Sequence, residues 1–315
     1  MKHEAKRRRF AAGLLIAAAL LLTAALAGLY IWHHIRLRKE AHILESRGYR
    51  YAAADGGYAL GCYTSGNDAG AYRIIAISGM GISDASIQYR TMCGSLSADY
   101  LFVCMDRAGC GISVDTKTPQ TVQQIVADYR TALKNVNIEP PYVLLPYAEG
   151  GVYAAYWESL YPDEIAGVCF LDCTVLSGEP PEPVPTASLR AKHLLAAFGA
   201  ARLSKAQLPN GYSAAEQLYA RFLRIRSTAS SAQISEMELF PENCQTAYES
   251  LVQNDIPKLY LNAGTRYTED MVKPYLEQLG SCEYLEIPAD SAVYMQKPMQ
   301  CAVLLTRFLS GLDES

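Results

Sequence analysis

Short apolar runs alternate with longer mixed segments along most of this chain, as strands alternate with helices. The runs at residues 73–78, 101–105, 142–145 and 165–171 predict buried strands. A hairpin is expected before them, with strands at 49–53 and 58–64 around the turn residues Asp55, Gly56 and Gly57. Further strands are predicted at 258–263 and 282–287, and a last helix near 296–309. The alternation predicts an α/β fold with a mostly parallel central sheet and helices on both faces.

A proline-rich segment at residues 177–185 interrupts this alternation. It introduces a helical stretch at 187–255, with helix candidates at 188–203 and 213–228. We therefore expect the first part of a core at 49–175, a helical insertion at 176–255 and the last part of the core at 256–315. The chain has no internal repeat.

The N-terminus combines a basic segment with a long apolar one. Residues 1–9 carry five cations, Lys2, Lys6, Arg7, Arg8 and Arg9, and residues 10–32 carry no charge. At about 1.5 Å per helical residue, the second segment is long enough to cross the roughly 30 Å of a bilayer core. The prediction is a cytoplasmic tail at 1–9, a transmembrane helix at 10–32 and a basic linker at 33–48.

Two features bear on whether the apolar segment is a cleaved signal peptide or an uncleaved membrane anchor. Ala25-Leu26-Ala27 resembles a signal-peptidase site, so a cleaved signal peptide competes with an uncleaved anchor. The apolar run continues to Trp32 and ends with Tyr30 and Trp32 as interfacial aromatic residues, which favours the anchor. More cations precede the run than follow it at Arg36, Arg38 and Lys39, so we expect a single-pass cell-membrane protein with its globular part outside the cytoplasm.

Composition excludes several functions. A net charge of -4 gives no basic surface for nucleic acid. The nine cysteines form no C-x-x-C pair and no zinc-spaced cluster, so neither a metal nor a cofactor is expected. Cys62, Cys104 and Cys169 lie in apolar runs and are expected in the core.

One turn stands where a common catalytic motif would occur but lacks the residue that would react. After the strand at 142–145 the chain reads Pro146-Tyr147-Ala148-Glu149-Gly150, and a helical segment and a second apolar run follow. A nucleophile elbow, G-x-S-x-G, occupies this kind of strand-to-helix corner and exposes a serine above the sheet. Here Ala148 stands at the serine position, and a methyl group cannot act as a nucleophile.

Other segments of the sequence resemble motifs of the proteins in which this elbow occurs. Residues 74–81 (IIAISGMG) resemble a strand followed by an H-G-x-G oxyanion loop, and 106–113 (DRAGCGIS) resemble a D-R-x-G-x-G-x-S turn. Residues 161–167 (YPDEIAG) and Leu171-Asp172 continue the pattern. From about residue 48 to 309, the chain resembles the α/β-hydrolase-fold superfamily of esterases and lipases. The resemblance implies that the helical insertion is a cap over the active site.

The resemblance also implies that the catalytic triad is lost. Tyr267 stands at the family's acid position and Ser291 at its histidine position, while Ser78 replaces the histidine that opens the oxyanion loop. A count supports this inference independently of the alignment. The five histidines are His3, His33, His34, His42 and His193, so none falls in the last hundred residues, where the base is expected.

Each of these features also has a simpler explanation. The turn at Ala148 is more economically an ordinary strand-to-helix connection, in which Gly150 and Gly151 allow close packing and Pro146 fixes φ. Cys173 or Ser291 as a replacement nucleophile is a weaker alternative, since no histidine is placed to activate either. Glu149 and Asp172 as an acid–base pair is another, and solvated or capping carboxylates are the simpler interpretation.

Two functions follow from these observations. The first is a membrane-anchored pseudoenzyme that binds a small ligand or a protein partner in a vestigial pocket. The second is a divergent hydrolase with a non-standard nucleophile. The residues expected to line the pocket are Ser78, Gly79, Met80, Tyr147, Ala148, Glu149, Tyr267 and Ser291, with the Met80 and Glu149 amides facing the ligand.

Overall fold

A computed structural model describes residues 2–96, 98–204, 211–290 and 292–312 of the chain. The strands are β1 Tyr49–Ala53, β2 Ala59–Gly66, β3 Arg73–Ile77, β4 Leu101–Asp106, β5 Tyr142–Pro146, β6 Ile165–Leu171, β7 Asn254–Asn262 and β8 Gly280–Glu286. The helices of the core are α2 Ala85–Gln88, α3 Arg90–Cys93, α4 Val122–Asn135, α5 Gly150–Leu160, α9 Glu269–Leu279, α10 Val293–Gln296 and α11 Pro298–Leu312, with short 3₁₀ turns η1 Gly94–Leu96 and η2 Pro162–Glu164.

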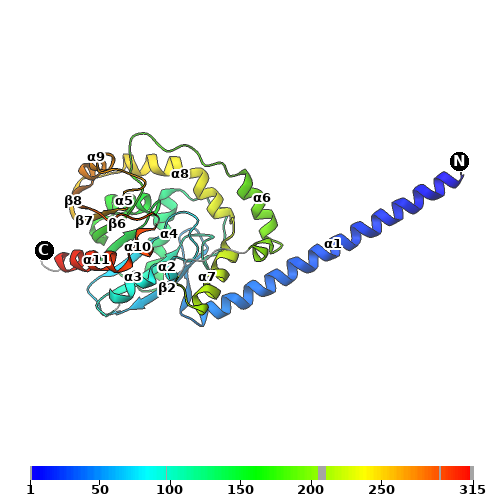
Figure 1. Cartoon of the computed structure of the whole chain (residues 1–315), viewed down its shortest axis with the longest axis horizontal. Coiled ribbons are helices and arrows are strands. Elements are labelled where there is room, and N and C mark those ends of the chain that lie inside the picture. The colour runs from blue at the N-terminus through cyan, green and yellow to red at the C-terminus, as the bar shows by residue number, and fades with distance from the viewer. Residues whose placement is uncertain (1, 97, 205–210, 291, 313–315) are drawn as a thin grey trace.

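The eight strands form one sheet in the order β1-β2-β4-β3-β5-β6-β7-β8 (Figure 1). Only the pairs β1–β2 and β2–β4 are antiparallel, and the other five pairs are parallel. The predicted fold class is therefore confirmed, and every predicted strand lies within four residues of its observed bounds. Because β3 to β8 run in the same direction, the loops at their carboxyl ends share one edge of the sheet, where α/β proteins place their sites.

The sheet is buried on both faces. In β3, Ile75 and Ile77 pack into the cluster that includes α4, α5 and α9, whereas Ile74 and Ala76 pack into the cluster that includes α2, α3, α10 and α11. Successive side chains of a strand point to opposite faces, so a run with no polar residue is what a doubly covered strand requires.

The insertion forms a cap of α6 Ala187–Ala196, η3 Ala200–Leu203, α7 Ala214–Ser227 and α8 Ser231–Glu249. The candidate helix at 188–203 is in fact divided, because Gly199 takes a left-handed φ of 80° and ends the α-helical run before η3. Helix α8 lies within the predicted helical stretch, although no separate candidate was predicted there, and it begins at an N-cap where the Ser230 hydroxyl accepts a hydrogen bond from the Gln233 amide.

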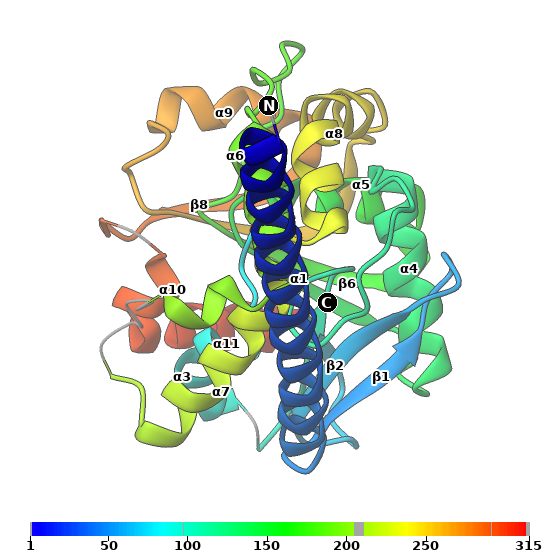
Figure 2. The ribbon, with the colours of Figure 1, turned by 90° about the vertical axis from the view of Figure 1, so that its right-hand side faces the viewer.

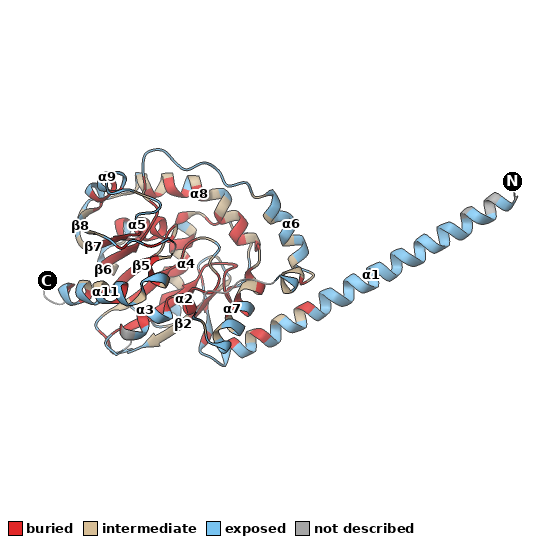
Figure 3. Ribbon diagram, in the orientation of Figure 1, coloured by how far each residue is buried: buried red, intermediate tan, exposed pale blue. Residues whose placement is uncertain are grey.

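The N-terminal helix, α1 Lys2–Glu45, is longer than predicted. Its part from Arg9 is long and apolar enough to span a membrane, and residues 10–32 are exposed, as Figure 3 shows. The segment expected as a linker, 33–48, is helical as far as Glu45 and docks on the cap. The Arg202 guanidinium donates to both Glu40 carboxylate oxygens, at 2.7 and 2.9 Å, and Leu44 is fully buried.

Candidate functional site

The corner after β5 has the strained geometry of an elbow. Ala148 has a left-handed φ of 50°, which a residue with a Cβ adopts at a cost of about 1–2 kcal/mol. Its amide donates to the Leu171 carbonyl at 3.3 Å, and its carbonyl accepts from the Thr174 amide at 2.9 Å, so the loop after β6 holds it in place. The simpler sequence interpretation, a strand-to-helix connection, did not anticipate the left-handed φ of Ala148.

Close packing behind the corner depends on the two glycines. A Cβ at Gly150 would lie 2.2 Å from the Ile77 carbonyl oxygen, and one at Gly151 would lie 2.6 Å from Cβ of Cys173. The start of α5 therefore lies directly against β3 and the loop after β6. Cys173 is fully buried and its thiol donates to the Pro146 carbonyl at 3.3 Å, which makes it a packing residue rather than an exposed nucleophile. Burial raises the pKa of this thiol well above its usual value.

The oxyanion loop is occupied by the protein's own carboxylate. The Met80 amide donates to Oε2 of Glu149 at 3.1 Å, and Oε1 of Glu149 forms an ion pair with Nη2 of Arg266 at 3.0 Å. Gly79 makes room for this contact, because a Cβ there would lie 2.8 Å from the same Oε2. We expected the Met80 amide to face a ligand, and instead it binds a side chain of the elbow itself.

The loops after β7 and β8 also reach the corner. Arg266, next to Tyr267, pairs with Glu149, next to Ala148. Tyr294 of α10 packs edge-on against Tyr147, with ring centroids 4.9 Å apart. Tyr267 is half-buried, and its carbonyl accepts from the Asn262 side-chain amide at 2.9 Å. Ser291 lies outside the described residues, so its place in a vestigial triad stays a prediction, as does the ligand-binding role of the whole set.

Sequence reasoning missed the group that holds the oxyanion loop. Arg107, in the turn after β4, donates from Nη1 to the Ser78 carbonyl at 2.6 Å and from Nη2 to the Gly79 carbonyl at 2.9 Å. Its Nε forms an ion pair with Glu236 of α8 at 2.9 Å, and both side chains are almost completely buried. The D-R-x-G turn was recognised, but nothing in the sequence marks Glu236 as its partner.

Asp106, the residue before Arg107, has a carboxyl group whose pKa is raised. Asp106 is buried against Gly111 and accepts from the Ile112 amide at 3.3 Å. Burial raises the pKa of Asp106 to about 7, with smaller opposing effects of this hydrogen bond and of Arg107. The Asp106 side chain thus stabilises the turn after β4.

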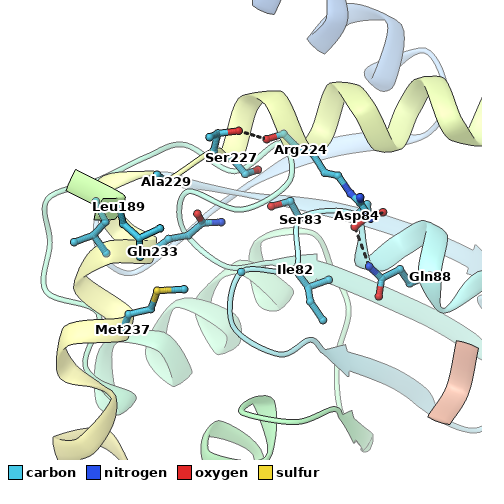
Figure 4. A pocket seen from close by; sticks show the side chains of 13 residues that line it. Ile82, Ser83, Asp84, Gln88, Leu189, Arg224, Ser227, Ala229, Gln233 and Met237 are labelled. Atoms are coloured by element: carbon cyan, nitrogen blue, oxygen red, sulfur yellow. Dashed lines mark hydrogen bonds and ion pairs between the residues drawn. The ribbon is translucent and has the colours of Figure 1, made fainter. Parts of the chain in front are cut away.

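A cavity of about 440 Å³ lies between the end of the oxyanion loop and the cap (Figure 4). Asp84 and Arg224 face it as an ion pair at 3.0 Å, and Gln88 donates to Asp84 at 2.9 Å. The remaining lining residues are Gly81, Ile82, Ser83, Leu189, Ser227, Thr228, Ala229, Gln233, Ile234 and Met237. The space combines paired charges, small hydroxyls and apolar walls.

Solved structures with the same arrangement identify the fold. An enol-lactonase from Burkholderia xenovorans LB400 superposes with a TM-score of 0.64 over 83% of this chain and 100% of its own, at 19% identity. A membrane phospholipase A superposes with a TM-score of 0.63 over 96% of this chain and 99% of its own, at 15% identity. This chain has the α/β-hydrolase fold. At these identities the likeness establishes the fold alone.

Comparison of the amino-acid sequence with known proteins is less informative than the comparison of structures. No family model matches the chain. An uncharacterized protein, YbdG, of Bacillus subtilis strain 168 is 29% identical over 190 residues, which cover 58% of this chain and 55% of that protein. A second uncharacterized protein of the same strain, YqjL, is 25% identical over 92 residues, 29% of this chain and 36% of its own length. The matched residues thus span about half, or less, of these relatives.

In an α/β-hydrolase-fold enzyme, the residue at the elbow attacks the substrate and the adjacent amides stabilise the oxyanion. Here the elbow carries a methyl group, and one of the two amide positions is filled by Glu149. In the described part of the chain, all five histidines lie in α1 or α6, away from the loops after β7 and β8. Among the described residues, the elbow therefore carries no nucleophilic side chain and the loops after β7 and β8 carry no histidine.

The buried pair between Arg107 and Glu236 gives a stability prediction. Glu236→Gln should lower the free energy of unfolding by about 3–5 kcal/mol, because the arginine charge stays buried without its partner. Glu238→Gln is the matched control, since Glu238 lies on the same helix and pairs with Arg190 at the surface. It should cost less than about 1 kcal/mol. Denaturant unfolding of the full chain in detergent measures both, and equal costs would show that the buried pair does not hold the cap.

Proposed function

We propose that this protein is a membrane-anchored, non-catalytic member of the α/β-hydrolase fold that binds a small ligand between its core and its cap. The observation that carries the proposal is the contact between the Met80 amide and the Glu149 carboxylate, beside an alanine at the elbow. An anion of the protein sits where a reaction would develop its negative charge. The alternative, a divergent hydrolase with another nucleophile, is tested by the same experiment.

The wild-type protein and Ala148→Ser should both fail to hydrolyse p-nitrophenyl acetate above the rate in buffer. A serine alone does not restore activity, because nucleophile, base and acid act as a unit. Product absorbance measures turnover, and a fluorophosphonate probe should label neither protein. Turnover or labelling that a substitution in this chain abolishes would favour the divergent hydrolase.

The cap cavity supports the binding part of the proposal. Its volume of about 440 Å³ is in the range of small-molecule sites. The two charges that face it, Asp84 and Arg224, are paired with each other, so a ligand need not bring a charge of its own. Ile82, Leu189 and Met237 provide apolar walls. We therefore propose a neutral amphiphile, with a hydrogen-bonding head near the hydroxyls and a short apolar chain.

Octanamide is a suitable probe of this cavity. Met237→Trp should weaken octanamide binding by at least about tenfold, because the larger side chain fills the space that the ligand needs. Met299→Trp, on an exposed part of α11, is the control and should leave the affinity unchanged. Isothermal titration calorimetry measures both. The absence of binding to the wild type, or equal affinities of the two variants, would contradict a site in the cavity.

Anchoring through α1, with the globular part outside the cytoplasm, completes the proposal. Support comes from the uncharged, exposed residues 10–32 and from the cluster of cations before them. The docking of α1 on the cap through Glu40 and Arg202 fixes the end of the helix from which the apolar segment extends.

Protease added to intact cells should therefore remove the globular part while the interior proteins stay whole, since positive charges favour the cytoplasmic side. Immunoblotting with an antibody to the C-terminal region measures the loss, and permeabilised cells provide the control. A protected domain would place it inside the cell, and a mature N-terminus at Gly28 would mean that the segment is a cleaved signal peptide.

A further inference from the structure

Apolar side chains are unusually exposed where α6 meets η3. Leu194, Leu195 and Leu203 are 68%, 60% and 87% exposed, and Phe198 between them is half-buried. We call these four residues the α6–η3 corner. Exposed leucines scattered singly need no explanation, but a group on one edge of a domain marks a surface that something covers.

The corner lies beside the end of the membrane-spanning candidate. The rings of Phe198 and Tyr30 have centroids 6.0 Å apart, and the Arg202 guanidinium lies 5.6 Å from the Trp32 ring. A Cβ at Gly199 would lie 2.9 Å from Nδ1 of His33, so the backbone there directly contacts α1. The corner is therefore at the level of Tyr30 to His33 along the helix.

Tyr30 and Trp32 mark where a membrane would end. Tyrosine and tryptophan favour the boundary between acyl chains and headgroups, and the uncharged run of α1 ends at Trp32. Any residue at their level is at headgroup depth when α1 spans a bilayer. Figure 1 shows α6 at the edge of the globular part, on the side from which the free part of α1 projects outward, and Figure 2 views the molecule from that side.

The charges around the corner fit the same surface. Lys192 of α6 and Arg221 of α7 are exposed, and both line the hollow that Leu195 and Ile225 also line. The Arg221 guanidinium donates to the Arg202 carbonyl at 3.2 Å, which keeps it close to η3. A helix with leucines on its surface and cations beside them is typical of segments that lie in the interface of an anionic bilayer.

We propose that the α6–η3 corner inserts into the outer part of the bilayer, as a second membrane contact of the cap beside α1. The inference rests on the proposed anchoring, because only a spanning α1 brings the corner to this depth. The occupant of the surface is a lipid bilayer with anionic headgroups. The contact fixes α6, whose Leu189 lines the cap cavity, against the membrane.

Tryptophan fluorescence tests the contact in the full-length protein in vesicles of phosphatidylcholine and phosphatidylglycerol. The variant Leu203→Trp is made in a Trp32→Phe background, where the only native tryptophan is the fully buried Trp157. Lipids brominated near the headgroup end of the acyl chain should quench the tryptophan at position 203 on the order of twofold. Met299→Trp in the same background is the control, since Met299 is 60% exposed on α11, and its emission should not change.

The arms of the experiment separate the inference from the anchoring on which it rests. In the otherwise unaltered chain, quenching of Trp32 by the same lipids reports whether α1 spans the bilayer. If Trp32 is quenched and the tryptophan at position 203 is instead quenched by acrylamide in the water, the corner contact is wrong although the anchor holds. Protection of position 203 from both quenchers would also overturn it, in favour of a protein partner or a second copy. No quenching of Trp32 would refute the anchoring itself.

Discussion

The ion pair between Arg107 and Glu236 is the interaction on which the arrangement of this molecule depends most. It joins three segments that are far apart in the sequence: the turn after β4, the oxyanion loop after β3 and helix α8 of the cap. Tyr153 of α5 donates to the same Glu236 oxygen at 2.8 Å. Because both charges are almost fully out of water, each is tolerable only while the other is present. The cap and the carboxyl edge of the sheet are thereby held as one unit.

This constraint explains how the loop after β3 keeps its backbone shape beside Ala148. Arg107 fixes the Ser78 and Gly79 carbonyls, so the Met80 amide keeps its direction whatever side chain stands at the elbow. Ala148 places only a methyl group at the elbow. The Glu149 carboxylate binds the Met80 amide and is neutralised in turn by Arg266. The remaining strain at Ala148 is a property of the backbone corner, imposed by the close approach of α5 to β3 at Gly150.

The sequence predicted the core well because each core strand is defined by local signals. The run at residues 142–146 is apolar on both faces, and such a run has few alternatives to a covered strand. The helices of the cap were harder to predict, because α8 has polar and apolar residues around its whole surface. It buries Glu236 and Asn243 among apolar neighbours. Periodicity alone does not detect such a helix. The contacts of Glu149 with Met80 and Arg266 could not be predicted from local sequence patterns either, because they join residues 69 and 117 positions apart.

The cap emerges as the element that connects the other parts. Helix α7 carries Arg224, which pairs with Asp84 at the cavity, and Arg226, which donates to the Leu37 carbonyl of α1 at 3.0 Å. Helix α8 holds the core through Glu236, and η3 holds α1 through Arg202. A shift of α1 relative to the core must therefore move or break the contacts of Arg202 and Arg226 with α1. Helix α7 thus carries the ion pair at the cavity and a contact with α1 on two arginines that are two positions apart.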